Sequence, residues 1–134
     1  MHVDNLVVVV TLASLLVYFW TSIQVANARV RNKIIAPAVA GHPEFERAYR
    51  VQMNTLEWLP LYLPSLWLFA YYFNAIIAAA IGLLWIVGRI VYALAYVKDP
   101  KRRGLGFSLQ TLATAVLLLG SLGKAVVLLA MQGA

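Results

Sequence analysis

The chain has 134 residues, of which 63% are hydrophobic and 12% are charged, and its formal net charge at pH 7 is +6. A soluble domain of this length is nearer half apolar and a quarter charged, so the composition excludes an ordinary water-soluble protein and indicates an integral membrane protein. The chain contains no cysteine, which excludes disulfides, thiolate metal sites and a protein thiol nucleophile. There is no room for a separate soluble domain, and we expect a single domain over residues 1–134.

Four apolar stretches follow one another along the chain, and each is near the length of about 20 residues that crosses a bilayer. They cover residues 6–28, 44–72, 75–97 and 105–131. The runs are long and continuous rather than alternating, which favours helices over the strands of a barrel. The sequence therefore predicts an all-α integral membrane protein built as a bundle of four transmembrane helices.

The second stretch carries a stripe of polar side chains. Arg47, Arg50, Asn54 and Glu57 are separated by three, four and three residues, which places them on one face of a helix. Ionisable groups at membrane depth are costly, and they usually face a bundle interior or a wet cavity at a functional site. Two cations, an amide and a carboxylate together indicate a binding site for a zwitterionic or anionic small molecule.

The third stretch repeats this pattern with Arg89, Tyr92 and Tyr96 on one face. An ion pair between Arg89 and Glu57 is one interpretation, since it would neutralise two charges inside the bundle. Arg103 precedes the fourth stretch and either anchors the membrane edge or points into the bundle to hold an anion, because a guanidinium stays charged and offers several donors.

The basic residues are distributed unevenly along the chain. Two groups flank the first and third loops: Arg29, Arg31, Lys33, Arg47 and Arg50 in one, and Lys98, Lys101, Arg102 and Arg103 in the other. With four spans these two loops share one side of the membrane, and the positive-inside rule places that side in the cytoplasm and both termini opposite. A simpler role for these charges is to set topology and to contact anionic membrane lipid.

The sequence shows no pattern for metal-dependent or hydrolytic catalysis. His2 and His42 are far apart and have no metal-ligand spacing, and there is no glycine-rich phosphate loop and no nucleophile elbow. We therefore expect no metal, and a membrane location of the basic residues makes nucleic acid an unexpected partner.

One long motif resembles a known family. The segment PEFERAYRVQMN, which begins at Pro43, together with Glu57 and the WLPL that follows it, is similar to the signature of the MAPEG family, the membrane-associated proteins in eicosanoid and glutathione metabolism. The similarity is greatest to the branch of leukotriene C4 synthase and the microsomal glutathione transferases. Residues 22–25, 28–29 and 89–96 fit the same pattern, so the resemblance covers nearly the whole chain.

The resemblance implies a homotrimer that binds glutathione as co-substrate between neighbouring subunits, near the cytosolic side. It implies a glutathione transferase acting on hydrophobic electrophiles, with peroxidase activity toward lipid hydroperoxides as an additional reaction. By position, the glutathione-binding residues of one protomer are Arg50, Asn54, Glu57, Trp58, Tyr92 and Tyr96, with Arg47 a weaker candidate. Arg29 and Gln52 would reach the same glutathione from the adjacent protomer, and Arg103 falls where the family places the arginine that stabilises the thiolate.

Two positions depart from the pattern of the leukotriene C4 synthases. Val30 stands where that branch has a second arginine, which disfavours leukotriene synthesis, and Trp58 replaces the usual tyrosine and removes a hydroxyl. Two other classes of function stay open at this point. One is a non-catalytic lipid- or glutathione-binding scaffold of the same fold. The other is a small multidrug-type transporter, which is expected to carry a carboxylate in its first span.

Overall fold

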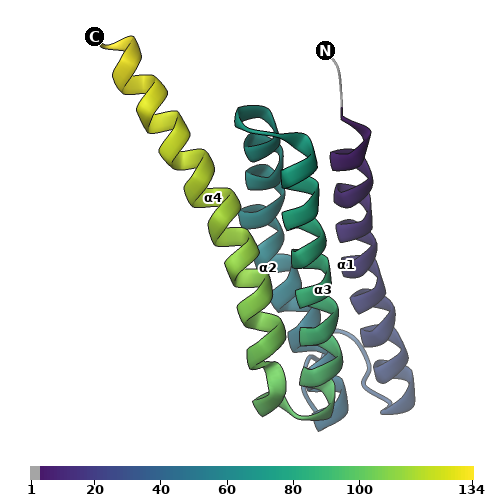
Figure 1. Ribbon diagram of the computed structural model, residues 1–134. Helices are drawn as coiled ribbons and strands as arrows, with labels where there is room; N and C mark the ends of the chain where they lie inside the picture. The colour runs from purple at the N-terminus through teal and green to yellow at the C-terminus, as the bar shows by residue number, and fades with distance from the viewer. Residues whose placement is uncertain (1–3) are drawn as a thin grey trace.

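The computed structural model describes residues 4–134, which form four long helices and one short one. These are α1 (Asn5–Arg31), α2 (Pro43–Tyr72), α3 (Ala75–Lys98), the 3-10 helix η1 (Pro100–Arg103) and α4 (Gly104–Gln132). Helices α2 and α3 form the middle of the bundle, with α1 packed along one side of them and α4 along the other (Figure 1). The predicted all-α, four-helix architecture is confirmed.

Side chains at the helix starts explain where three helices begin. The carboxylate of Asp4 accepts a hydrogen bond from the Leu6 amide at the start of α1, and Asn74 does the same for Ile76 and Ile77 at the start of α3. Helix α2 begins at Pro43, a residue whose fixed φ suits the first helical position, and His42 caps it.

Three helical segments are long and apolar enough to cross a membrane, namely α1, α3 and α4 together with the preceding η1. Helix α2 is not among them, because its first turns are charged and its later turns are rich in Tyr, Trp and Pro, which lower its hydropathy. With 30 residues α2 is nonetheless about 45 Å long at 1.5 Å per residue. Helix α2 packs against all three other long helices, whereas Glu44, Glu46 and Arg50 in its first half stay exposed.

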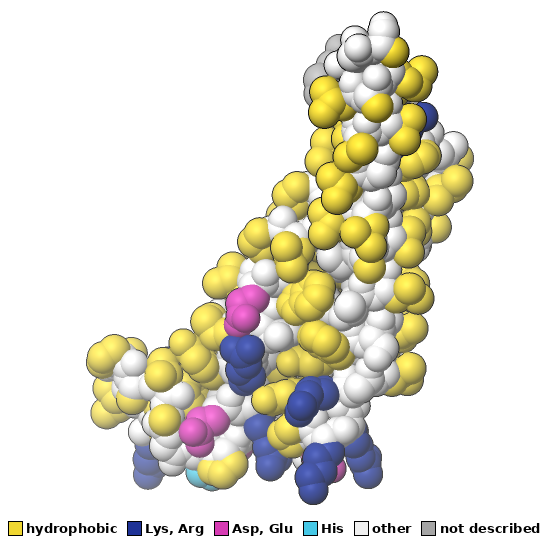
Figure 2. All heavy atoms as spheres, turned by 90° about the vertical axis from the view of Figure 1, so that its left-hand side faces the viewer, with side chains coloured by type: hydrophobic (Ala, Val, Ile, Leu, Met, Phe, Trp, Pro, Cys, Tyr) yellow, Lys and Arg dark blue, Asp and Glu magenta, His cyan; other side chains and the backbone are white. Residues whose placement is uncertain are grey.

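Apolar side chains cover much of the outside of the bundle, and several polar side chains are buried among the apolar residues of its core. Large hydrophobic side chains are exposed along every long helix, and Figure 2 shows them covering most of one face. The buried polar residues are Ser14, Thr21, Thr55, Ser65, Arg89, Gln110, Thr114 and Ser121. Several of their hydroxyls donate to the backbone carbonyl one turn earlier, which satisfies them without water. This polarity is the one expected of a protein whose surroundings are lipid.

Charged residues gather at one end of the bundle. The start of α1 and the end of α4 lie at one end, and the connections α1–α2 and α3–α4 lie at the other (Figure 1). Figure 2 shows Lys and Arg side chains concentrated at that second end. The two basic groups expected from the first and third loops therefore share one end of the molecule, which we call the basic end.

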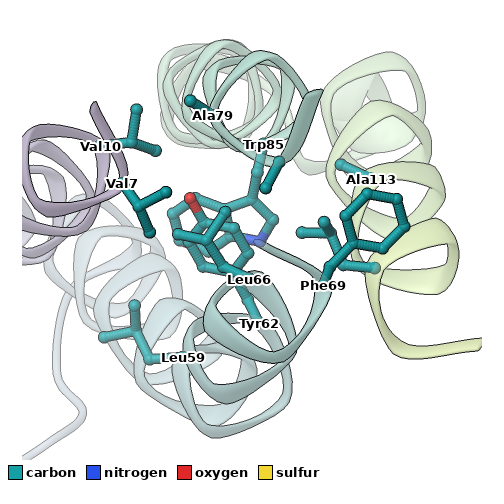
Figure 3. Close-up of a cluster of buried hydrophobic side chains, with 11 residues drawn as sticks. Val7, Val10, Leu59, Tyr62, Leu66, Phe69, Ala79, Trp85 and Ala113 are labelled. Carbon is teal, nitrogen blue, oxygen red and sulfur yellow. The ribbon is translucent and has the colours of Figure 1, made fainter. Parts of the chain in front are cut away.

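The central packing contact joins α2 to α3 through two aromatic rings (Figure 3). Tyr62 and Trp85 stack with their centroids 4.0 Å apart and their planes 4° from parallel, and both side chains are fully buried. The Tyr62 hydroxyl lies 2.9 Å from the Ser14 hydroxyl. Ser14 already donates its proton to the Val10 carbonyl, so Tyr62 is the donor toward Ser14 and ties α1 to α2, with the Gly82 carbonyl oxygen of α3 as a more distant acceptor at 3.4 Å.

Replacing Tyr62 by phenylalanine is expected to lower the free energy of unfolding by about 0.5–1 kcal/mol, the range for one interhelical hydrogen bond in a membrane protein. The stacked ring remains and Ser14 keeps its bond to Val10, so no buried donor is orphaned. Thermal unfolding in detergent measures the effect, with Tyr71→Phe as control because Tyr71 is 82% exposed. Equal unfolding temperatures of the two variants would contradict the structural role of the Tyr62 hydroxyl.

Helices α3 and α4 approach each other through two glycines. A Cβ atom added to Gly88 would lie 2.7 Å from the Gln110 amide nitrogen and 3.0 Å from the Gly106 carbonyl oxygen. A Cβ atom on Gly106 would lie 2.7 Å from both the Gly88 carbonyl oxygen and the Tyr92 Cα. Small residues at such crossings let the backbones of membrane helices come close. The contact brings the first turns of α4 against Tyr92 on α3.

Candidate functional site

A polar pocket opens near the basic end, where α2, α3 and the start of α4 meet. Its volume is about 460 Å³, and its lining residues are Arg50, Asn54, Tyr92, Tyr96, Arg103 and Phe107. Five of these six are site residues predicted from the sequence. They come from three helices, so the structure brings together side chains that are far apart in the chain.

Helical spacing accounts for each pair of lining residues. Arg50 and Asn54 lie one turn apart on α2, Tyr92 and Tyr96 lie one turn apart on α3, and Phe107 follows Arg103 by one turn. Arg103 ends η1, so the amino-terminal end of α4 begins beside the pocket.

The charged groups at the pocket are accessible to a ligand, although Glu57 does not line the pocket and lies beside it as the ion-pair partner of Arg50. Arg50 Nη1 donates to Glu57 Oε1 at 2.9 Å, and the two side chains are 50% and 55% exposed. Arg103 Nη1 donates to the Pro100 carbonyl oxygen at 3.1 Å, and within residues 4–134 its other guanidinium donors make no hydrogen bond. An exposed ion pair such as Arg50–Glu57 contributes little to stability, so both partners are available to charges on a ligand.

Beneath Asn54 lies a buried hydrogen-bonded cluster centred on Arg89. The ion pair between Arg89 and Glu57 that the sequence suggested is wrong. Arg89 does not pair with Glu57. It donates from Nη2 to Asn54 Oδ1 at 2.7 Å and from Nη1 to Thr55 Oγ1 at 3.1 Å, and it is 1% exposed. The residues of α2 that face α3 at this level are Asn54 and Thr55, whereas Glu57 projects toward Arg50 and the surface.

Aromatic rings form the apolar wall of the pocket. The ring centroids of Tyr92 and Tyr96 are 5.5 Å apart, and that of Phe107 is 6.0 Å from Tyr92. Trp58 packs edge-on against Phe107 at 5.5 Å but does not itself line the pocket. Sequence reasoning missed Phe107, although its position one turn after Arg103 was a usable signal.

Three predicted site residues lie away from the polar pocket of their own chain. Arg47 points to the end of α3, with Nη1 3.5 Å and 3.4 Å from the carbonyl oxygens of Val97 and Lys98. Gln52 donates to Ser22 on α1 at 3.0 Å.

Arg29 is the third of these residues, and it is held by the first loop. It donates to the Ala38 carbonyl oxygen at 2.7 Å and lies over the Phe45 ring, 4.6 Å from its centroid. Arg29 and Gln52 therefore both belong to the α1 side of the bundle, opposite the side on which α4 packs.

A second cavity of about 290 Å³ lies between α1, α2 and α3 and shares no lining residue with the polar pocket. Its walls are mostly apolar, and the ion pair between Arg31 Nη2 and Glu44 Oε1, 2.6 Å long, belongs to its lining. Within residues 4–134 no three His, Asp or Glu side chains come close enough to hold a metal ion. His2 lies outside the described residues.

Comparison with known proteins gives the family. Residues 7–123 match the sequence model of the MAPEG family. The chain is 43% identical over 105 residues to human microsomal glutathione S-transferase 2, covering 78% of this chain and 71% of that protein. It is 42% identical over 113 residues to the uncharacterized protein sll1147 of Synechocystis sp., covering 84% and 82%. It is 38% identical over 98 residues to leukotriene C4 synthase of Cavia porcellus, covering 73% and 65%. The chain is an integral membrane protein and belongs to the MAPEG family.

Proposed function

We propose that this protein is a membrane-bound glutathione transferase that ionises glutathione in the polar pocket and transfers it to hydrophobic electrophiles. The observation that carries the proposal is the meeting of Arg50, Asn54, Tyr92, Tyr96 and Arg103 in one pocket. The names of two relatives, a microsomal glutathione S-transferase and a leukotriene C4 synthase, support the same class of reaction.

The donors and acceptors of the pocket fit the groups of glutathione, which carries two carboxylates, one ammonium and a thiol. Arg50 suits a carboxylate through charge-assisted hydrogen bonds, and Glu57 suits the ammonium. Their mutual pair at 2.9 Å already arranges one positive and one negative charge side by side, as a zwitterionic amino acid end requires. When glutathione binds, the exposed ion pair between Arg50 and Glu57 is replaced by two new ones, Arg50 with a carboxylate and Glu57 with the ammonium of the ligand.

Arg103 is the residue that activates the thiol. A guanidinium close to the sulfur favours the thiolate, which is the nucleophile. The thiol proton leaves to water at the exposed basic end, where Arg103 itself is exposed. The sulfur then forms a bond to the electrophilic carbon, and the leaving group departs with the electrons of the bond that breaks. When the electrophile is an epoxide, the C–O bond of the ring breaks, and its oxygen stays on the product as an alkoxide that takes up a proton.

Hydrophobic substrates approach from the lipid. Phe107 and, behind it, Trp58 provide an apolar wall on the α4 side of the pocket. With a lipid hydroperoxide, the thiolate attacks the terminal peroxide oxygen and the lipid leaves as an alkoxide, which becomes an alcohol. The sulfenic acid of glutathione so formed condenses with a second glutathione to the disulfide and water.

The assembly we propose is a homotrimer embedded in membrane lipid, with the basic end in the cytoplasm. Arg29 and Gln52 lie on the α1 side, remote from the polar pocket of their own chain. A neighbouring subunit that presents this side to the pocket would add a cation and an amide to it. The concentration of basic residues at the pocket's end favours the cytoplasmic orientation.

Replacing Arg50 by alanine is expected to raise the KM for glutathione about 10- to 100-fold, because a hydrogen bond to a charged group contributes about 1.5–3 kcal/mol. The value of kcat should change less, since Arg50 binds the ground state and the transition state alike. Steady-state conjugation of a chlorodinitrobenzene by protein in lipid vesicles measures both constants.

Arg31→Ala is the matched control for Arg50→Ala. Arg31 also forms an exposed ion pair with a glutamate, but it lies outside the polar pocket. An equal rise of KM in both variants would contradict the assignment of the pocket. Glutathione binding without formation of any conjugate would favour the alternative function of a non-catalytic binding scaffold. The transporter alternative lacks its key feature, because α1 contains no Asp or Glu.

A further inference from the structure

We infer that Arg89 is a positioning residue that fixes the side-chain amide of Asn54 as a hydrogen-bond donor toward the polar pocket, so that the ligand must present an acceptor oxygen there. The identity of that ligand as glutathione rests on the proposed function. The orientation of Asn54 does not.

The direction of the Asn54 amide follows from donor chemistry. A guanidinium has five N–H donors and no acceptor, so the atom of Asn54 that lies 2.7 Å from Arg89 Nη2 is the carbonyl oxygen. The NH₂ group of Asn54 is then turned away from Arg89. Asn54 lines the polar pocket, and its NH₂ group makes no hydrogen bond within residues 4–134. Two unused donors therefore remain for a ligand.

Arg89 is itself held in one place. Its Nη1 donates to Thr55 Oγ1. The Thr55 hydroxyl donates its own hydrogen bond to the Val51 carbonyl oxygen at 2.8 Å, so its oxygen can accept from Arg89. The guanidinium carbon lies 4.4 Å from the centroid of the Tyr92 ring and 5.9 Å from that of Trp85. Two hydrogen bonds and two ring faces fix the plane of the guanidinium. The fixed guanidinium in turn fixes the position of the Asn54 carbonyl oxygen that it binds.

The charge of Arg89 is difficult to explain as packing alone. The side chain is 1% exposed, and the ion pairs in the described part of the chain involve Arg31 and Arg50 instead. An apolar side chain would fill the same space at lower cost, because a buried charge without a carboxylate partner keeps most of its desolvation penalty. A cation beneath the pocket floor has a use, however, since it polarises the Asn54 amide and strengthens its N–H donors.

The consequence is a rule for the ligand. Arg50, Arg103 and the Asn54 NH₂ group all donate, so a carboxylate or peptide carbonyl oxygen has to face Asn54. Asn54→Asp tests this directly because the new side chain has the same shape and still accepts from Arg89, but it presents an acceptor to the pocket. We expect Asn54→Asp to weaken glutathione binding at least as much as Asn54→Ala, about tenfold or more.

The experiment combines a double-mutant cycle with the aspartate variant, measured by calorimetric titration of the full-length protein with glutathione. Arg89→Met and Asn54→Ala should each raise Kd about tenfold, and the double variant should bind no more weakly than Asn54→Ala alone. Arg89→Lys, which keeps the charge but not the fork of donors, should recover only part of the affinity. Tyr62→Phe, which removes a buried hydrogen bond remote from the pocket, should lower the unfolding temperature and leave Kd unchanged.

Three results would overturn the inference: wild-type affinity in Asn54→Asp, additive effects in the double variant, or a lower unfolding temperature of Arg89→Met with unchanged Kd. A second readout needs no ligand. The chain has five asparagines, so protein labelled with ¹⁵N-asparagine gives five side-chain amide signals, and Asn54→Ala identifies the one of interest.

The amide signal separates this inference from the proposed function. If wild-type protein binds no glutathione, the proposed function fails. A displaced Asn54 signal in Arg89→Lys would then still support the positioning role, and an unmoved signal would overturn it.

Discussion

Replacing Arg103 by alanine is expected to lower kcat for conjugation about 10- to 100-fold while glutathione remains bound through Arg50, Asn54 and Glu57. A thiol with an ordinary pKa of about 8.5 is only about 3% ionised at pH 7, and a pKa lowered by about 2 units raises this to about 75%. Loss of the guanidinium therefore removes most of the nucleophile. Stopped-flow single-turnover kinetics with preloaded glutathione isolates this step from binding.

The pH dependence gives the sign of the Arg103 effect. In the variant the bound thiol ionises at higher pH, so the single-turnover rate should climb through the alkaline range in which the wild-type rate has already levelled. Arg102→Ala is the control, because Arg102 is the adjacent exposed arginine of η1 and does not line the polar pocket. Wild-type turnover in Arg103→Ala, or an equal loss in Arg102→Ala, would refute the thiolate role.

Replacing Gly106 by alanine is the second change with a large expected effect. The added methyl group would meet the backbone of Tyr92 and the carbonyl oxygen of Gly88, and backbone atoms cannot rotate aside as a side chain can. The helices α3 and α4 have to separate, at the upper end of the cost of about 1–3 kcal/mol that overpacking usually carries. Tyr92 then moves away from Phe107 and Arg103, so both the unfolding temperature and glutathione affinity should fall.

Gly123→Ala provides the matched control for the glycine contact. It makes the same chemical change in the same helix, but a Cβ atom there meets nothing within 4 Å. Because alanine favours a helix over glycine by about 1 kcal/mol, this variant should be neutral or slightly stabilised. Comparable unfolding temperatures for Gly106→Ala and Gly123→Ala would show that the α3–α4 approach is looser than the structure indicates.

Helical periodicity predicted the elements and the faces of this protein well. The four apolar stretches correspond to the four long helices, because about 20 apolar residues in a row leave a helix as the simplest way to satisfy the backbone in lipid. The spacing of Arg50 and Asn54, and that of Tyr92 and Tyr96, placed each pair on one face. The structure then places both faces on the same pocket.

Periodicity does not say which side chains on two facing helices meet. Arg89 and Glu57 were plausible partners by charge, yet the level at which α3 crosses α2 puts Asn54 and Thr55 opposite Arg89. Arg47 shares a face with Arg50, but its long side chain reaches the last carbonyl groups of α3 instead of the pocket. Such outcomes depend on the offset between helices, and no single helix contains that information.

The sequence also does not predict the close approach of α3 and α4. A glycine in an apolar stretch can lie at a helix crossing, as Gly106 does, or on a helix face without a close neighbour, as Gly123 does. The same limit applies to the subunits. The faces that carry Arg29 and Gln52 are defined by one chain, whereas their meeting with the polar pocket of a neighbour depends on the proposed trimer.

The most direct test of the proposed function is an ultraviolet difference titration of the purified protein in detergent with glutathione, followed at the absorbance of the thiolate. A saturable thiolate signal at neutral pH that disappears in Arg103→Ala but persists in Arg102→Ala is the predicted result. It would place an ionised glutathione beside Arg103 in the polar pocket. The absence of any thiolate signal at saturating glutathione, or its persistence in Arg103→Ala, would contradict the proposal.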